Sequence, residues 1–267
     1  FLSVHPNKDG SLLFENPRAF QGKGETTWEG LIKSVRGKVK GTKAKIRLGA
    51  SSGEWKAMVA DEVARTTFAK NIKNVLEKNN LDGIDLDFEW AENEKEYEDY
   101  SLAILKMREV LGDKYLFSVS LHPVCYKISK KAIEAVDFIS LQCYGPSPVR
   151  FPIEKYCSDI QMVLEYGIPK EKLVAGVPFY GVTKDNSKKT EAYFNFVQDG
   201  LITSPSQNEV ICQGDTYVFD GQDNIRIKTR YAKEQKLKGM MSWDLATDLP
   251  LSDSRSLLKT MTEELRE

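Results

Sequence analysis

Apolar runs rich in β-branched and aromatic residues alternate with helical patterns along the whole chain, and this alternation is the strongest constraint on its fold. Helical periodicity is found at residues 61–78, 93–112, 153–166 and 252–265. Strands that alternate with helices indicate βαβ units and therefore a parallel sheet. The seven runs expected to be strands are residues 1–5, 44–49, 81–90, 115–121, 136–144, 173–180 and 239–245.

This order predicts the α/β fold class, as a (β/α)8 barrel that forms a single domain over residues 1–267, a length at which such barrels are common. Seven strands are one fewer than a closed barrel needs, and the chain starts inside an apolar run. The first barrel strand is therefore expected to be missing from the chain or to precede it. The stretch 181–229 is too long for a simple helical crossover, so it predicts a short inserted loop or hairpin region around 182–228, after barrel strand 7.

Charge and residue composition exclude several classes of protein. The 38 basic and 39 acidic side chains leave a net charge of −1, which argues against a nucleic-acid partner, because phosphate binding needs a clustered excess of Lys and Arg. The sequence contains no apolar run near the roughly 20 residues of a membrane span, so none is predicted. It has two histidines, and its four cysteines form no CxxC pair, so no metal site is expected.

The run 82–89 carries an unusual row of acids. Alternate residues of a strand share a face, so Asp85, Asp87 and Glu89 are expected to point the same way. Three carboxylates on one face repel one another, and at least one of them is expected to retain a proton. Such a row is tolerated mainly where the chemistry needs a protonated acid beside an ionised one. The apolar residues expected on the opposite face are Ile84, Leu86 and Phe88.

Two structural interpretations compete with catalysis. Asp85, Asp87 and Glu89 have the spacing of a calcium loop with Glu96 as its last ligand, but Trp90 stands where that loop needs Gly, and a strand rather than a helix precedes it. A solvated acidic edge strand conflicts with the bulky apolar residues between the acids. Catalytic carboxylates are therefore the favoured interpretation.

The pattern Asp82-x-x-Asp85-x-Asp87-x-Glu89 resembles the signature of family 18 glycoside hydrolases, the chitinases and their relatives. Three further segments resemble barrel strands of that family, the third at 45–50, the seventh at 176–181 and the eighth at 239–244. The resemblance implies a (β/α)8 barrel with its site at the C-terminal ends of the strands. Asp82 lies off the catalytic face and is expected to organise the entry into the strand.

The resemblance also implies a substrate-assisted retaining mechanism with an oxazolinium intermediate. Glu89 would act as general acid and base, Asp87 would hold the acetamide N–H of the substrate, and Asp85 would modulate Asp87. Tyr144 would donate its hydroxyl to the acetamide oxygen. Trp243 is expected to stack on a sugar ring. The other residues expected to line the same pocket are Gln142 and Tyr180.

Two positions depart from the family pattern. Chitinases usually carry Met-x-Tyr-Asp on the sixth strand, where this chain has Gln142-Cys143-Tyr144-Gly145. Gln at that position is more typical of plant-type chitinases and of endo-β-N-acetylglucosaminidases. On the third strand, Arg47 replaces a small Ser that faces the inner Asp, and a cation there is expected to keep Asp85 ionised. The insertion around 182–228 also looks shorter than the one in processive chitinases, which suggests a shallow, endo-acting cleft.

The function predicted from the resemblance is hydrolysis of β-1,4 linkages between N-acetylglucosamine units of chitin or another glycan that contains them. No cofactor is expected, because the acid and the substrate's own acetamide supply the chemistry. The protein is expected to be exported and monomeric. An endo-β-N-acetylglucosaminidase acting on N-glycan cores and a non-catalytic chitin-binding lectin are the alternatives. Glu89 favours an enzyme, because silent relatives typically replace this residue.

Overall fold

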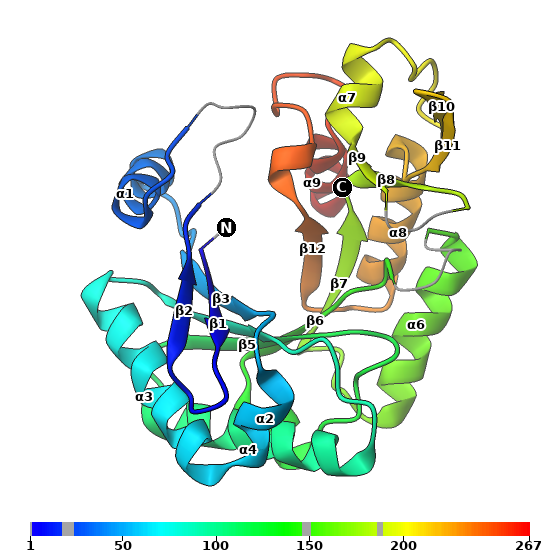
Figure 1. The fold of residues 1–267 in the computed structure, drawn as a ribbon. Helices are drawn as coiled ribbons and strands as arrows, with labels where there is room; N and C mark the ends of the chain where they lie inside the picture. Colours follow the sequence, from blue (N-terminus) through cyan, green and yellow to red (C-terminus); the bar gives the residue numbers. More distant parts are fainter. Residues whose placement is uncertain (1, 18–23, 146–150, 186–188) are drawn as a thin grey trace. The chain divides into compact units, whose positions relative to one another are not determined.

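The computed structural model describes residues 2–17, 24–145, 151–185 and 189–267 (Figure 1). The chain consists of two compact units, Phe1–Ile139 and Ser140–Glu267. Strand β6, Phe138–Leu141, contains the boundary between them. Within the described residues no helix is both long enough and apolar enough to cross a membrane.

The first unit is built on a largely parallel sheet in the order β2-β1-β3-β4-β5. β1, β3, β4 and β5 pair in parallel, whereas β2 pairs with β1 in an antiparallel hairpin at the edge. The strands are β1 (Ser3–Pro6), β2 (Leu12–Glu15), β3 (Arg47–Ser51), β4 (Gly83–Asp87) and β5 (Leu116–Leu121). The helices of this unit are α1 (Trp28–Lys38), α2 (Trp55–Ala60), α3 (Glu62–Lys78), α4 (Glu94–Leu111) and α5 (Lys130–Ala135).

Local capping explains where the two long helices begin. Asp61 caps α3, because its carboxylate accepts a hydrogen bond from the backbone N–H of Ala64 at 2.7 Å. Asn93 caps α4 through the N–H of Glu96, whose own carboxylate accepts from the N–H of Glu92. α4 ends at Gly112 with φ 61°. These starts and stops confirm the helices predicted at 61–78 and 93–112.

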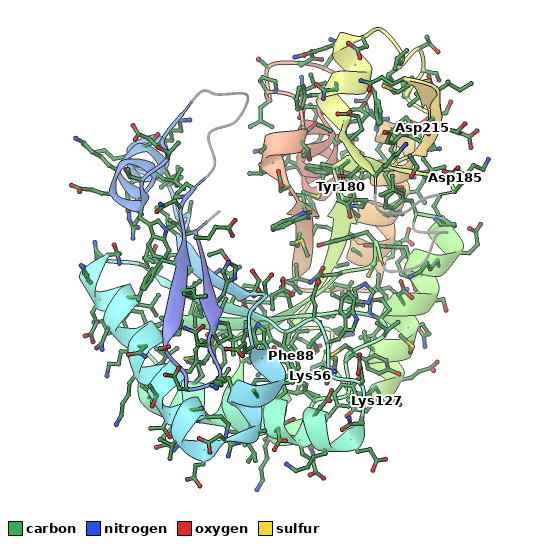
Figure 2. All side chains as sticks on the ribbon, viewed as in Figure 1. Lys56, Phe88, Lys127, Tyr180, Asp185 and Asp215 are labelled. Atoms are coloured by element: carbon green, nitrogen blue, oxygen red, sulfur yellow. The ribbon has the colours of Figure 1, made fainter. Side chains whose placement is uncertain are left out.

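Side-chain packing beneath β4 forms the core of the first unit. Phe88, which is labelled in Figure 2, stacks on Trp55 with ring centroids 5.5 Å apart and lies 5.2 Å from the ring of Tyr100. Gly83 permits the close approach of β4 to β5, because a Cβ there would lie 2.0 Å from the carbonyl oxygen of Leu116. β4 is thus fixed at both ends. Phe88 packs among aromatic rings just after its last residue, and Gly83, its first residue, lies close against β5.

The second unit combines two pieces of sheet. β7 (Leu173–Pro178) and β12 (Gly239–Trp243) pair in parallel. A small antiparallel sheet has the order β10-β11-β8-β9. Its strands are β8 (Tyr180–Thr183), β9 (Thr190–Ala192), β10 (Glu209–Cys212) and β11 (Asp215–Val218). The helices of this unit are α6 (Ile153–Tyr166), α7 (Tyr193–Gln198), α8 (Gln222–Glu234), the 3-10 turn η1 (Leu245–Thr247) and α9 (Leu257–Arg266).

The structure confirms the predicted α/β class and places a strand in each of the seven predicted runs. The insertion contains the expected hairpin, β10–β11, whose turn residues Gln213 and Gly214 both have positive φ. It also contains α7 and β9, which the sequence did not indicate. The single domain over 1–267 and the barrel strand before the chain stay predictions.

Candidate active site

The acidic row lies where β4 ends, as the alternation predicts. Asp85 and Asp87 are half-buried within β4, and Glu89 is exposed two residues after the strand. The residues that alternate with the acids are at most 3% exposed and point into the core: Ile84, Leu86 and Phe88. The strand period of two therefore separates a carboxylate face, with Asp85 and Asp87, from an apolar face, and Glu89 follows in the same alternation two residues beyond the strand.

Asp85 is anchored by three side chains from the two neighbouring strands. The hydroxyl of Ser120 donates to its Oδ2 at 2.7 Å, and the hydroxyl of Ser118 donates to its Oδ1. Nη1 of Arg47 lies 3.5 Å from the same Oδ1 and also donates to the oxygen of Ser118. The register explains this convergence, because Ser118 of β5 and Gly49 of β3 lie directly opposite Asp85.

Arg47 itself is held in place. Its guanidinium lies over the ring of Phe138 at 4.7 Å from the centroid. The predicted contact between Arg47 and Asp85 is present.

The two serines were not predicted, although the run Phe117-Ser118-Val119-Ser120-Leu121 alternates small polar with apolar residues and so places both hydroxyls on one face.

Asp82 lies outside the row and ties together the start of two strands. Its Oδ2 accepts from Nη1 of Arg36 at 2.9 Å and from the backbone N–H of Ile46 at 2.7 Å. Nζ of Lys45 lies 3.9 Å from Oδ1. These contacts agree with the expectation that Asp82 organises the entry into the strand.

Two buried groups beneath the row stay protonated. Burial raises the pKa of Tyr100 well above its usual value, and the nearby Cys125, Asp85 and Asp87 add to the rise. Its hydroxyl donates to the carbonyl oxygen of Leu86 at 3.3 Å. Burial likewise raises the pKa of the Cys125 thiol, whose sulfur accepts from the N–H of Ala91 at 3.3 Å. Both act as neutral supports of the strand and of the segment that follows Glu89.

The segments after β4 and β5 are fastened to each other beside Glu89. The rings of Trp90 and His122 lie 4.7 Å apart. His122 is buried, and its Nδ1 accepts from the N–H of Val124 at 3.3 Å. Tyr97 donates its hydroxyl to the carbonyl oxygen of Val124 at 3.2 Å. Glu89, the proposed acid, therefore follows the buried core residue Phe88 and precedes Trp90, whose ring packs against His122.

The second unit brings two of the predicted residues together. The ring of Tyr144, just after β6, lies 6.4 Å from the ring of Tyr180, just after β7, in an edge-to-face arrangement. Gly176 lets Tyr144 pack over β7, because a Cβ there would lie 3.0 Å from the tyrosine ring. The hydroxyl of Tyr144 lies 3.8 Å from Sδ of Met241. Phe151 joins the cluster 6.2 Å from Tyr180, which is labelled in Figure 2.

The remaining predicted residues also lie at strand ends. Gln142 directly follows β6 and is buried, whereas Trp243 is the last residue of β12 and is 40% exposed. Apart from Asp85, which is the middle residue of β4, each predicted site residue thus lies at or just beyond the C-terminal end of a strand of the large sheet, the position at which α/β barrels carry their sites. The individual roles of these residues stay predictions.

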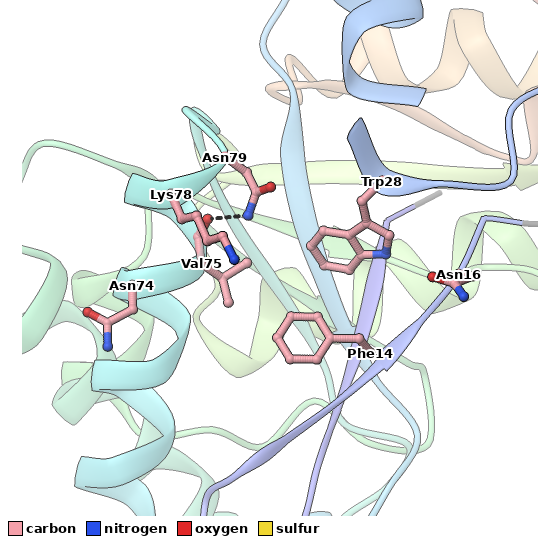
Figure 3. A pocket seen from close by; sticks show the side chains of 7 residues that line it. All are labelled: Phe14, Asn16, Trp28, Asn74, Val75, Lys78 and Asn79. Carbon is pink, nitrogen blue, oxygen red and sulfur yellow. Dashed lines mark hydrogen bonds between the residues drawn. The ribbon is translucent and has the colours of Figure 1, made fainter. Parts of the chain in front are cut away.

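A separate open pocket of about 340 Å³ lies elsewhere in the first unit (Figure 3). The indole N–H of Trp28 donates to the carbonyl oxygen of Glu15 at 2.7 Å, and its ring lies 5.3 Å from that of Phe14. Residues of the acidic row do not line it. Trp55 is not part of it and is buried in the core. The lining residues are Phe14, Asn16, Trp28, Asn74, Val75, Lys78 and Asn79.

No group of three or more His, Cys, Asp or Glu side chains in the described part of the chain is arranged to hold a metal ion. The four cysteines are free thiols, and three of them are buried.

Comparison with known proteins gives a consistent family. The profile of glycosyl hydrolases family 18 matches residues 1–248. "Probable chitinase 2" of Drosophila melanogaster is 24% identical in a match that covers 74% of this chain and 54% of that protein, so the chain spans about half the length of this relative. Two solved structures share the fold. One is the family 18 chitinase ChiB of Flavobacterium johnsoniae, with TM-score 0.78, 24% identity and coverage of 98% of this chain and 84% of the other.

The second is a chitinase-like agglutinin of Robinia pseudoacacia, with TM-score 0.74, 16% identity and 99% coverage of both chains. These likenesses show the fold, which is the (β/α)8 barrel of family 18.

Proposed function

The chain belongs to glycosyl hydrolase family 18, and we propose that it is a chitinase-like hydrolase of β-1,4 linkages between N-acetylglucosamine units. The observation that carries the proposal is that Asp85 and Asp87 share one face of β4 and that Glu89 lies exposed two residues beyond the end of this strand. Similarity to proteins named chitinases supports the same class of substrate.

In the proposed reaction, the exposed Glu89 protonates the glycosidic oxygen that leaves. The substrate's own acetamide oxygen attacks the anomeric carbon as the glycosidic bond breaks, and this forms an oxazolinium ion. Asp87 accepts the acetamide N–H and stabilises the positive charge that develops next to it. Glu89 then removes a proton from the incoming water, which opens the oxazolinium ring with net retention at the anomeric carbon.

The aromatic residues of the second unit have supporting roles in this proposal. Tyr144 donates its hydroxyl to the acetamide oxygen and so orients the attacking atom, while Tyr180 packs against its ring. Trp243, exposed at the end of β12, stacks on a sugar ring, and Gln142 contributes an amide. The chemistry calls for no cofactor, and the enzyme acts as an exported monomer on a glycan outside the cell.

Two other functions each have one observation in their favour. Gln142 favours an endo-β-N-acetylglucosaminidase, because that class more often carries Gln there. The likeness to an agglutinin favours a chitin-binding lectin on the same barrel.

A parallel digest of chitotetraose and of a high-mannose glycoprotein separates the three functions. Glu89→Gln is the test variant. Glu92→Gln is the matched control, because Glu92 is an exposed acid three residues further along that pairs with Lys56 instead. Chitobiose release that is lost with Glu89→Gln and kept with Glu92→Gln supports the proposal. Release of the intact glycan identifies the endo-glycosidase, and binding of chitin without turnover identifies the lectin.

A further inference from the structure

The open pocket of the first unit, here called the Trp28 pocket, has the lining of a small-molecule site. Its volume of about 340 Å³ falls within the range of about 300–1,000 Å³ found for ligand pockets, which combine apolar and aromatic walls with a few polar groups. The seven lining residues contribute two aromatic rings, three carboxamides, one ammonium group and one valine, and none of the seven carries a carboxylate. The pocket thus offers ring faces together with amide donors and acceptors.

One wall of the Trp28 pocket consists of the rings of Phe14 and Trp28, which lie 5.3 Å apart with an interplanar angle of 64° (Figure 3). The indole N–H of Trp28 donates to the carbonyl oxygen of Glu15 at 2.7 Å, which fixes the orientation of this ring. Phe14 is 56% exposed although it lies within β2. Because the indole N–H is already bonded, the wall presents apolar ring surface. A pyranose has a matching partner, because its C–H bonds form an apolar face.

The other wall of the pocket is one side of helix α3. It contributes two pairs of residues four positions apart, which are neighbours on a helix: Asn74 and Lys78, and Val75 and Asn79. The side-chain N–H of Asn79 donates to the carbonyl oxygen of Val75 at 2.9 Å, which orients this carboxamide. Asn74 and Lys78 are exposed. A carboxamide both donates and accepts, whereas an ammonium group only donates, so this wall can bond both the hydroxyls and an acetamide of a sugar.

The Trp28 pocket lies at the entry end of the strands of the first unit, away from the acidic row. Asn79 caps the end of α3, a few residues before β4 starts at Gly83. At the same end, the ion pair of Arg36 with Asp82 joins α1 to the entry of β4. Glu89 lies beyond the other end of β4, whose five residues span about 13 Å at a rise of about 3.3 Å per residue. A sugar ring in the pocket would therefore be bound away from the reacting bond.

We propose that the Trp28 pocket is a second carbohydrate site, which binds a pyranose unit of an N-acetylglucosamine chain and so holds the enzyme on its polymeric substrate. The inference rests on the proposed function for the identity of this sugar and goes beyond it, because the pocket takes no part in the reaction. The ring of Phe14 packs on the C–H face of the sugar. The carboxamides of Asn74 and Asn79 bond its hydroxyl and acetamide groups, and Lys78 donates to a further oxygen. With no carboxylate in its lining, the pocket fits an uncharged polymer rich in acceptor oxygens.

Two indole N–H signals distinguish the two sites in one titration. In ¹⁵N-labelled Glu89→Gln protein, which should bind glycan without turnover, the signals of Trp28 and Trp243 are assigned by their loss in Trp28→Phe and Trp243→Phe. Chitotetraose should shift the Trp28 signal, and cellotetraose, which lacks acetamide groups, should shift it less at the same concentration. No shift of the Trp28 signal, or equal shifts with both sugars, overturns the inference. If the Trp28 signal shifts while that of Trp243 does not, the second site stands and the proposed binding of substrate at the acidic row fails.

Binding to insoluble chitin tests the contact with the polymer. Phe14→Ala is the test variant and Leu13→Ala the matched control, because both side chains are 56% exposed on β2 and Leu13 does not line the pocket. Combined with Glu89→Gln, Phe14→Ala should weaken binding about two- to tenfold, the size of one aromatic contact, whereas Leu13→Ala should leave it unchanged. Asn74→Ala, at an exposed position of α3, should weaken binding in the same direction. Equal binding of Phe14→Ala and Leu13→Ala overturns the inference.

Discussion

Replacement of Lys228 by Met tests what stabilises the second unit next to its aromatic cluster. Lys228 and Asp220 are almost fully buried, and Nζ lies 2.6 Å from Oδ2 and 2.8 Å from Oδ1 of the carboxylate. Nζ also donates to the carbonyl oxygen of Phe151 at 2.8 Å. Removing one partner of a buried pair costs about 3–5 kcal/mol, because the other charge stays buried and unpaired. We expect Lys228→Met to lower the free energy of unfolding by about that amount and Tm by about 10 °C.

The size of this loss should depend on pH. Burial raises the pKa of Asp220 in the folded protein, and the charge of Lys228 opposes that rise. In Lys228→Met this opposing positive charge is absent, so Asp220 in the folded variant binds a proton at a higher pH than it does in the unfolded chain. Protonation then favours the folded state. The difference in the free energy of unfolding between wild type and variant should therefore become smaller as the pH falls from about 8 to about 5.

Urea unfolding followed by tryptophan fluorescence at several pH values measures this deficit. Lys184→Met is the matched control, because Lys184 pairs with Glu209 at 2.8 Å on the surface and should contribute no more than about 1 kcal/mol. Adding Asp220→Leu to Lys228→Met should recover much of the lost stability, since no buried charge then remains. A deficit below about 1 kcal/mol, or one that is the same at every pH, would refute the reasoning.

Three further changes test the site and the strand that carries it. Glu89→Gln should lower kcat by about 10²–10⁴-fold while chitotetraose still binds, as measured by stopped assays and calorimetry; near-normal turnover would remove Glu89 from the role of acid. Trp243→Ala should raise KM up to about tenfold with a smaller effect on kcat, because a stacked ring binds ground and transition states alike; an unchanged KM would place the sugar elsewhere. Gly83→Ala should lower the free energy of unfolding by about 1–3 kcal/mol, because its Cβ would lie 2.0 Å from the carbonyl oxygen of Leu116. A thermal melt with the Tm of wild type would contradict this clash.

The features that the sequence predicted are those set by local periodicity. The acidic row follows from the strand period alone, since buried Ile84 and Leu86 fix which face Asp85 and Asp87 take. Helix starts follow from single capping residues such as Asp61. The contact of Arg47 with the inner acid was predicted from the family resemblance and is present at 3.5 Å.

The features that it did not predict depend on register and packing between distant segments. Ser118 and Ser120 reach Asp85 because β5 pairs with β4 in one register, and a shift by one residue would turn both hydroxyls to the other face. The burial of Trp55 is decided by Phe88 and Tyr100, which lie far along the chain. Neither the contacts of the two serines with Asp85 nor the burial of Trp55 produces a recognisable pattern in the sequence around these residues.

The fold does not decide between a hydrolase and an agglutinin, because barrels of both kinds match this chain over nearly its whole length. The arrangement of Asp85, Asp87 and Glu89 is more informative about the function than the fold is. Sugar binding needs aromatic faces and hydrogen-bond donors, but it does not need like charges next to one another, which repel. In this chain, a cation and two hydroxyls surround Asp85, while Glu89 lies exposed at the end of the row. A general acid must come within hydrogen-bond reach of its substrate, and the exposed position of Glu89 meets this requirement, which favours the hydrolase.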